Sequence, residues 1–220
     1  MERALQETSS VRTAVRVGLA AFLLAIPAVA QDQRFDLGVR GVLTAADGEP
    51  ANDIPGFGVF GRYRWSDRWS LGLAVDQTEY DFEQPARILG LQQDPRLEPI
   101  DVVAEATVIS AWLQRDYARA RTTWFWGVGL GLASIDVPDA KGPLAGSGSF
   151  DIQTDADSEI IASLTGGVIR RLGDRWFLEF ALRADQHFAD WQLKDRISGA
   201  TGAIDDYLAW GGHLGFGFRF

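Results

Sequence analysis

Long stretches of this chain alternate large apolar residues with small, polar or charged ones at every second position. The pattern is clear between residues 176 and 184, where the apolar set is Trp176, Leu178, Phe180, Leu182 and Ala184. It recurs between residues 208 and 220, where the apolar set is Leu208, Trp210, Leu214, Phe216, Phe218 and Phe220. A period of two is that of a β-strand, whose successive side chains point to opposite faces. We therefore expect an all-β fold.

Eight segments carry this alternation, at about residues 34–44, 56–66, 69–80, 102–115, 122–135, 159–171, 175–188 and 206–220. Short connections between them alternate with long ones, which span about residues 45–55, 81–101, 136–158 and 189–205. Short turns at one end and long loops at the other are typical of an up-and-down barrel. The sequence predicts an eight-stranded antiparallel barrel that occupies residues 31–220 as one domain.

The position of the glycines indicates which face of this barrel is apolar. Gly127, Gly129 and Gly131 alternate with the large apolar residues between Trp124 and Leu132. In a small barrel the crowded interior favours small side chains, so the large apolar set is expected to face outward, into lipid. A transmembrane β-barrel follows. The alternative is a soluble β-sandwich with the same apolar residues in its core.

Aromatic residues gather near both ends of the predicted strands. One group lies by the short turns and comprises Tyr63, Trp65, Trp69, Tyr117, Trp124 and Trp176. The other lies by the long loops and comprises Tyr80, Phe82, Phe188, Trp191 and Tyr207. Two such belts are expected at the two membrane–water interfaces.

Residues 1–30 have the organisation of a secretory signal peptide. Arginines at positions 3, 12 and 16 precede an apolar stretch from Val17 to Ile26, and the small-residue triplet Ala28-Val29-Ala30 follows. A spanning helix needs about 20 apolar residues, and this stretch is shorter. We expect cleavage after Ala30 and export of the remainder.

The C-terminal residues carry a more specific pattern. His213 is followed by Gly215, and aromatic residues, Phe218 and Phe220, stand third from last and last. This pattern resembles the assembly signal of bacterial outer-membrane β-barrels. With eight strands, it makes the chain similar to the small outer-membrane barrels typified by the OmpA transmembrane domain, OmpX and OmpW.

The resemblance implies a place in the outer membrane of a Gram-negative-type bacterium and recognition by the barrel assembly machinery. It also implies contact with outer-membrane lipid and lipopolysaccharide. The prediction is a monomer without a cofactor. With a formal net charge of −9, the chain is an unsuitable partner for nucleic acid.

The alternation sends a balanced set of charges into the barrel. The expected acids are Asp36, Asp76, Glu105, Glu179 and Asp185, and the expected bases are Arg40, Arg62, Arg64, Arg183 and Arg219. Buried charges persist when they are paired, so this set predicts a lumen plugged by ion pairs. The alternative is a narrow gated path for small solutes or protons.

Three functions are consistent with such a barrel. The leading hypothesis is a non-enzymatic protein that contributes to envelope integrity or surface interaction through acidic extracellular loops. The first alternative is an OmpW-like conduit for small or hydrophobic molecules. The second is a lipid A modifying hydrolase, because some similar barrels use a Ser-His pair with an acid. Ala189 stands two residues after His187, where the deacylase of that kind has serine, so only His187, Asp185 and Asp190 remain for this chemistry.

The long loops are predominantly acidic. One of them carries Asp151, Asp155, Asp157 and Glu159, which supply carboxylate oxygens of the kind that calcium binds. The spacing and the glycine of a calcium loop are absent. A weak divalent-cation site and a solvated acidic face are the two interpretations, and the segment near 138–150 is expected to be an outer loop.

Overall fold

The computed structural model describes residues 34–46, 55–83, 86, 89–91, 101–144, 148–156 and 158–220. The predicted signal peptide, residues 1–30, lies outside this part of the chain. Among the described residues, no helix is long and apolar enough to cross a membrane.

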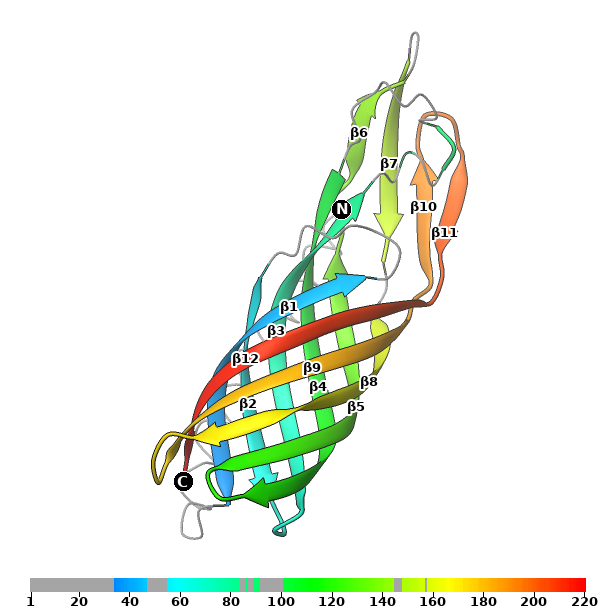
Figure 1. Cartoon of the computed structure of the whole chain (residues 1–220). Helices are drawn as coiled ribbons and strands as arrows, with labels where there is room; N and C mark the ends of the chain where they lie inside the picture. Colours follow the sequence, from blue (N-terminus) through cyan, green and yellow to red (C-terminus); the bar gives the residue numbers. More distant parts are fainter. Residues whose placement is uncertain are drawn as a thin grey trace.

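Eight antiparallel strands close into a barrel (Figure 1). They are β1 (Phe35–Ala46), β2 (Gly56–Arg64), β3 (Trp69–Glu83), β4 (Asp101–Arg119), β5 (Thr122–Asp136), β8 (Glu159–Arg171), β9 (Trp176–Phe188) and β12 (Tyr207–Arg219). The predicted fold is confirmed, and each strand overlaps its predicted segment. The alternation of side chains specified them, because lipid on one face and a packed bore on the other both require a period of two.

The barrel closes between its first and last strands. β1 pairs with β12 in antiparallel register from Asp36↔Arg219 to Ala46↔Ala209. The short turns and the C-terminal residue lie together at one end of the barrel (Figure 1). The long connections leave from the opposite end.

A second sheet stands beyond the long-loop end of the barrel (Figure 1). Its strands are β6 (Ala140–Pro143), β7 (Ser149–Asp155), β10 (Trp191–Asp195) and β11 (Thr201–Ile204), in the order β11-β10-β7-β6. Phe150, Ile152 and Leu193 are buried in an apolar cluster with Ala86, Val102 and Ala140. The expectation of a loop near 138–150 is corrected here: β6 and the start of β7 lie outside the barrel as expected, but they are paired strands, because this apolar cluster holds both. We call these four strands the outer sheet.

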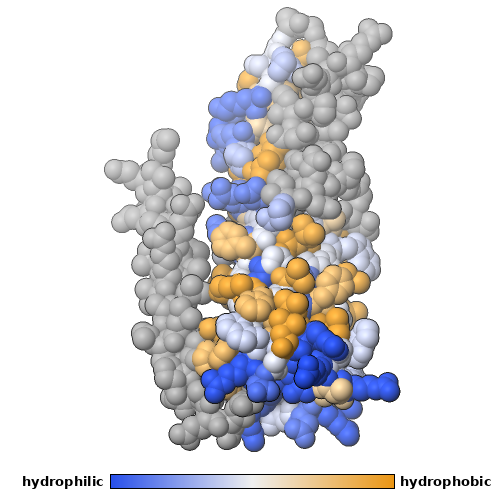
Figure 2. Space-filling model, turned by 60° about the vertical axis from the view of Figure 1, so that its left-hand side comes forward, coloured by the Kyte–Doolittle hydropathy of each residue, from blue (hydrophilic) through white to orange (hydrophobic). Residues whose placement is uncertain are grey.

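The outer surface of the barrel is apolar around its middle. Figure 2 shows a band of hydrophobic side chains between hydrophilic ends. Outward-facing Leu130 is 66% exposed, Trp124 is 61% exposed and Phe180 is 51% exposed. Exposure of so many large apolar side chains is costly in water and favourable in lipid. The predicted orientation of the apolar face is confirmed.

The aromatic group near the long loops differs from the prediction. Trp191 begins β10 of the outer sheet and is buried at 1% exposure, and Tyr207 stacks on His187 inside the barrel. Phe188 is exposed, and the side chains of Tyr80 and Phe82 lie outside the described part of the structure. Trp191 packs in an apolar cluster with Ala104 and Ile161, and Tyr207 lies on the inward-facing side of β12 together with His213, so both rings pack inward.

Glycines in the barrel wall make room for rings inside it. A Cβ on Gly72 would overlap the indole of Trp112, and a Cβ on Gly217 would overlap the ring of Phe177. The bore is therefore filled by aromatic as well as charged side chains at these levels.

Candidate functional site: the barrel interior

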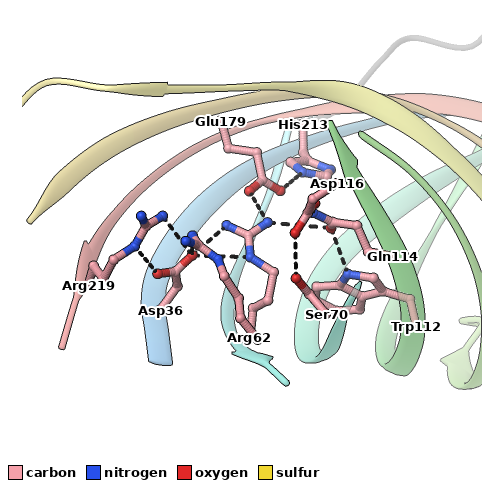
Figure 3. A network of polar contacts seen from close by, with 10 residues as sticks. Asp36, Arg62, Ser70, Trp112, Gln114, Asp116, Glu179, His213 and Arg219 are labelled. Atoms are coloured by element: carbon pink, nitrogen blue, oxygen red, sulfur yellow. Dashed lines mark hydrogen bonds and ion pairs between the residues drawn. The ribbon is translucent and has the colours of Figure 1, made fainter. Parts of the chain in front are cut away.

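Near the short-turn end, Asp36 from β1 is surrounded by arginines (Figure 3). Its Oδ2 accepts hydrogen bonds from Arg62 Nε at 3.2 Å and Nη2 at 3.0 Å, and its Oδ1 accepts one from Arg219 Nε at 2.8 Å. Arg64 Nη2 donates to the same carboxylate. Asp36 and Arg62 are both fully buried. Because the arginines come from β2 and β12, this acid ties both neighbours of β1 together.

Arg62 also extends across the bore to β9. Its Nη1 lies 2.8 Å from Glu179 Oε2. The other oxygen of Glu179 is 3.0 Å from His213 Nε2. The Arg62 guanidinium lies 5.5 Å from the ring centroid of Phe177, a distance suited to a cation–π contact. One buried arginine therefore joins carboxylates on two sides of the barrel.

Strand β4 supplies a polar extension of this network (Figure 3). Gln114 Nε2 donates to Asp116 Oδ1 at 2.6 Å, and Ser70 Oγ from β3 donates to Asp116 Oδ2 at 2.6 Å. Trp112 Nε1 donates to Gln114 Oε1 at 3.3 Å. We call the combined set the lower layer; it comprises Asp36, Arg62, Arg64, Ser70, Gln114, Asp116, Glu179, His213 and Arg219.

A second ionic layer lies further along the bore. Arg40 donates to both oxygens of Asp76, with Nε at 2.7 Å from Oδ1. Arg183 Nη1 is 3.7 Å from Asp76 Oδ2, and its Nε donates to Asp185. Ser163 Oγ donates to the other Asp185 oxygen at 2.6 Å. This upper layer, Arg40, Asp76, Arg183, Asp185 and Ser163, has as many arginines as carboxylates.

A small cavity of about 30 Å³ is lined by residues of both layers. Its lining combines charged and hydroxyl groups and includes Arg40, Glu179, Arg183, His213, Ser163 and Thr165. A polar cavity of this kind is suited to water, which would supply the hydrogen bonds that the layers leave unmade.

A third polar group lies above the upper layer, where the long loops begin. His187 Nδ1 is 2.8 Å from Glu159 Oε2, and both side chains are 1% exposed. Tyr207 stacks on His187 with ring centroids 4.4 Å apart. Apolar residues enclose the group, among them Ile161, Ile135 and Trp191.

Nine of the ten charged residues expected in the lumen lie there; Glu105 does not. Glu105 is exposed, because Ala104 and Ala106 take the inward positions of β4. The interior acid on this strand is Asp116 instead. Because apolar and polar residues alternate only weakly in β4, the sequence suggested that its odd-numbered residues face the bore, and the structure shows the even-numbered ones there. Gln114 and Asp116, two polar residues at even-numbered positions, were the sequence signal for the correct face.

His213 has a partner that the sequence pattern concealed. In the sequence, His213 was explained by its polar position in the C-terminal motif. In the structure its Nε2 lies against Glu179. Gly215 faces the bore at the level of Phe60. Phe218 packs edge-on against Trp176 and Phe220. Recognition of this motif by assembly machinery stays a prediction.

The acidic segment does not assemble a cation site among the described residues. These residues contain no group of three or more ligands that could hold a metal, and Asp157 lies outside them. Asp151 is 3.2 Å from Lys141 and 3.4 Å from Arg196. Glu159 turns into the barrel toward His187. Because the chain passes from the outer sheet into β8 here, the carboxylates diverge.

The hydrolase hypothesis needs an acid and a serine beside His187. The acid that contacts His187 Nδ1 is Glu159. Asp185 instead accepts hydrogen bonds from Arg183 and Ser163. Asp190 is exposed. The three residues left by the sequence for this chemistry therefore do not form a cluster.

No family model and no curated protein matches the chain. Solved structures do. Neisserial surface protein A has 15% identity and a TM-score of 0.48, over 84% of this chain and 96% of its own. Ail, the attachment invasion locus protein of Yersinia pestis, has 16% identity and a TM-score of 0.47, over 85% and 97%. The E. coli outer membrane protein W has 13% identity and a TM-score of 0.41, over 85% and 97%.

The likeness to these proteins is one of fold. The closed barrel, its apolar outer band and its charged bore are observed directly in this chain. The chain is thus a closed, eight-stranded antiparallel β-barrel with an apolar outer band and a charged bore.

Proposed function

We propose that this protein is a non-enzymatic, monomeric barrel of the bacterial outer membrane that closes its own lumen and presents the outer sheet at the cell surface. The observation that carries the proposal is Arg62, which is fully buried and bridges Asp36 and Glu179 across the bore. Because the Arg62 side chain has no solvent-exposed surface, no open water channel runs past it through the bore. The physical role is envelope integrity or surface interaction.

The outer sheet supports the second half of the proposal. Its apolar cluster gives it a core separate from the barrel interior. Exposed carboxylates surround it, including Asp139, Asp155, Asp190 and Asp205. In the proposed orientation these acids face outside the cell. They would meet anionic lipopolysaccharide through divalent cations, since like charges otherwise repel.

Heat-modifiable migration on SDS gels tests the closed barrel, and planar bilayers test the closed lumen. We expect a faster band before boiling and silent membranes at high protein loading. Substitution of Arg62 with alanine should introduce conductance, because two buried acids then lose their bridge. The matched control is Arg175→Ala in an exposed turn, which should stay silent. Uniform steady channels from the unmodified protein would contradict the proposal.

A conduit for small molecules is the second candidate, and the cavity between the layers favours it. That space of about 30 Å³ holds a water-sized molecule, and a larger solute would pass only if both layers rearranged. Swelling of protein-loaded liposomes in small sugars or amino acids tests transport. Lipid A mass spectrometry after incubation with lipopolysaccharide tests the hydrolase alternative, and the non-enzymatic proposal expects unchanged acylation.

A further inference from the structure

Exposed arginines ring the short-turn end of the barrel. They include Arg68, Arg119, Arg121, Arg171 and Arg175, with half-buried Arg115 on the wall above them. None of these six forms an ion pair with any described carboxylate, although Asp67 and Asp174 lie in the same turns. Figure 2 shows hydrophilic side chains at this end, directly below the apolar band. The ring is therefore a surface of uncompensated positive charge at the edge of the membrane-facing wall.

The backbone fixes three of these arginines in equivalent places. Each is the last residue of a short turn, directly before the next strand, and its carbonyl accepts a hydrogen bond from the neighbouring strand. The pairs are Asp116 N with Arg68 O, Arg171 N with Arg121 O, and Arg219 N with Arg175 O, each at 2.8 Å. Tryptophan follows directly in two cases, as Trp69 and Trp176. The backbone thus places these three arginines at equivalent positions of the barrel end, and two of them stand next to tryptophans, residues typical of a membrane interface.

Arg115 is the most constrained member. On the outer face of β4 it lies between Trp69 of β3 and Trp126 of β5 in the strand register. Its guanidinium carbon is 5.2 Å from the Trp69 ring and 5.7 Å from the Tyr117 ring. Its Nε is buried and has no hydrogen-bond partner among the described residues. A lipid-facing charge framed by rings and lacking an acid requires a counter-ion from its surroundings.

We propose that this ring, centred on Arg115, binds the phosphate of an anionic phospholipid in the leaflet at the short-turn end. The inference rests on the proposed placement in a membrane. The planar fork of arginine matches phosphate oxygens, and the flanking aromatic rings contact the glycerol and upper acyl region. A zwitterionic headgroup supplies the same phosphate with a cation attached, which the surrounding arginines repel. The ring therefore selects net negative headgroups.

Native mass spectrometry of the folded full-length barrel, released from nanodiscs, tests this selectivity. The nanodiscs contain phosphatidylcholine alone or three parts phosphatidylcholine to one part phosphatidylglycerol. We expect phosphatidylglycerol to be enriched among the retained lipids. One basic group near a membrane surface changes binding about five-fold, so Arg115→Gln should lower retention by about that factor. Arg196→Gln, in the outer sheet, is the matched control and should retain phosphatidylglycerol normally.

Arg171→Gln in the turn provides a second variant if Arg115→Gln fails to give the heat-modifiable band. Retention of the two lipids by the unmodified protein in the three-to-one proportion supplied would overturn the inference. So would undiminished phosphatidylglycerol retention in the folded ring variant. These outcomes are separate from bilayer conductance: channels with lipid selectivity would refute the closed lumen alone, and silence without selectivity would refute the lipid site alone.

Discussion

Glu159 Oε2 and His187 Nδ1 lie 2.8 Å apart inside the barrel, and the other oxygen of Glu159 has no hydrogen-bond partner among the described residues. The two side chains come from β8 and β9, where both strands meet the outer sheet. A buried carboxylate with one unsatisfied oxygen depends strongly on the partner it has. Tyr207 Oη donates to the same Oε2 at 3.4 Å, so His187 and Tyr207 together hold this acid.

His187→Phe retains the stacking on Tyr207 and removes the nitrogen that faces Glu159. We expect the free energy of unfolding to fall by about 1–3 kcal/mol, because the buried acid then keeps only the longer hydrogen bond from Tyr207 Oη, at 3.4 Å. Urea unfolding in phospholipid vesicles, followed by tryptophan fluorescence, measures the change. Exposed Glu105→Gln is the control. Equal midpoints for the two variants would contradict the interpretation.

Arg62→Met removes the bridge of the lower layer while preserving much of its apolar stem. Asp36 and Glu179 would lose a buried partner, which costs about 3–5 kcal/mol in comparable cases. The same vesicle assay reports the loss. Arg64→Met serves for comparison, since its side chain is 22% exposed. We expect the Arg64 variant to lose clearly less stability than the Arg62 variant; the reverse order would be incompatible with the network described.

Phe180→Arg places a charge on the apolar band. The expected cost is about 2–4 kcal/mol near the middle of the membrane. Ile197→Arg is matched, because Ile197 is 60% exposed but follows β10 in the outer sheet. Its stability in vesicles should be unchanged. A neutral result for Phe180→Arg would mean that this face does not contact hydrocarbon.

Gly72→Ala and Gly41→Ala test how tightly the bore is filled. A methyl group at Gly72 overlaps the Trp112 ring, whereas one at Gly41 meets no atom within 4 Å. Overpacking of this kind costs about 1–3 kcal/mol. We expect reduced refolding yield and stability for Gly72→Ala alone. Identical heat-modifiability curves for both variants would show that Trp112 moves aside freely.

Asp195 gives the outer sheet a defined dependence on pH. A hydrogen bond from the Ser198 hydroxyl, with others from the amides of Asp151 and Ser198, lowers the pKa of its carboxyl to about 2. Because the folded pKa lies below the usual value of about 3.9, the carboxylate stabilises the sheet fully above about pH 4. That contribution is lost as the pH falls through about 2.

Amide proton resonances of Asp151 and Ser198 should therefore shift together with a midpoint near pH 2. In Asp195→Asn that transition should disappear, because no charge remains to titrate. The amide of Ala189, which donates to Asp206, is an internal reference in the same spectrum. A common midpoint near pH 4 would show that the carboxylate is not held in this way.

The strands and the apolar face could be predicted because lipid and bore impose opposite demands on alternate residues. Most interior charges followed from the same parity. The prediction for Glu105 was wrong because Ala104 and Ala106, which are small and apolar, face the bore in the upper part of β4 and leave Glu105 on the outer face. His213 acquires its significance only from Glu179, 34 positions away. The outer sheet was missed because β10 and β11 are too short to reveal a period, and their stability comes from contacts between separate loops.

The pairing of Asp36 with Arg219 has a consequence for biogenesis. These residues lie at opposite ends of the described chain, yet they face each other across the seam and share an ion pair. Loss of the final strand would leave two adjacent strands with bare hydrogen-bonding edges, which favour joining to other molecules. Prematurely terminated copies should consequently aggregate.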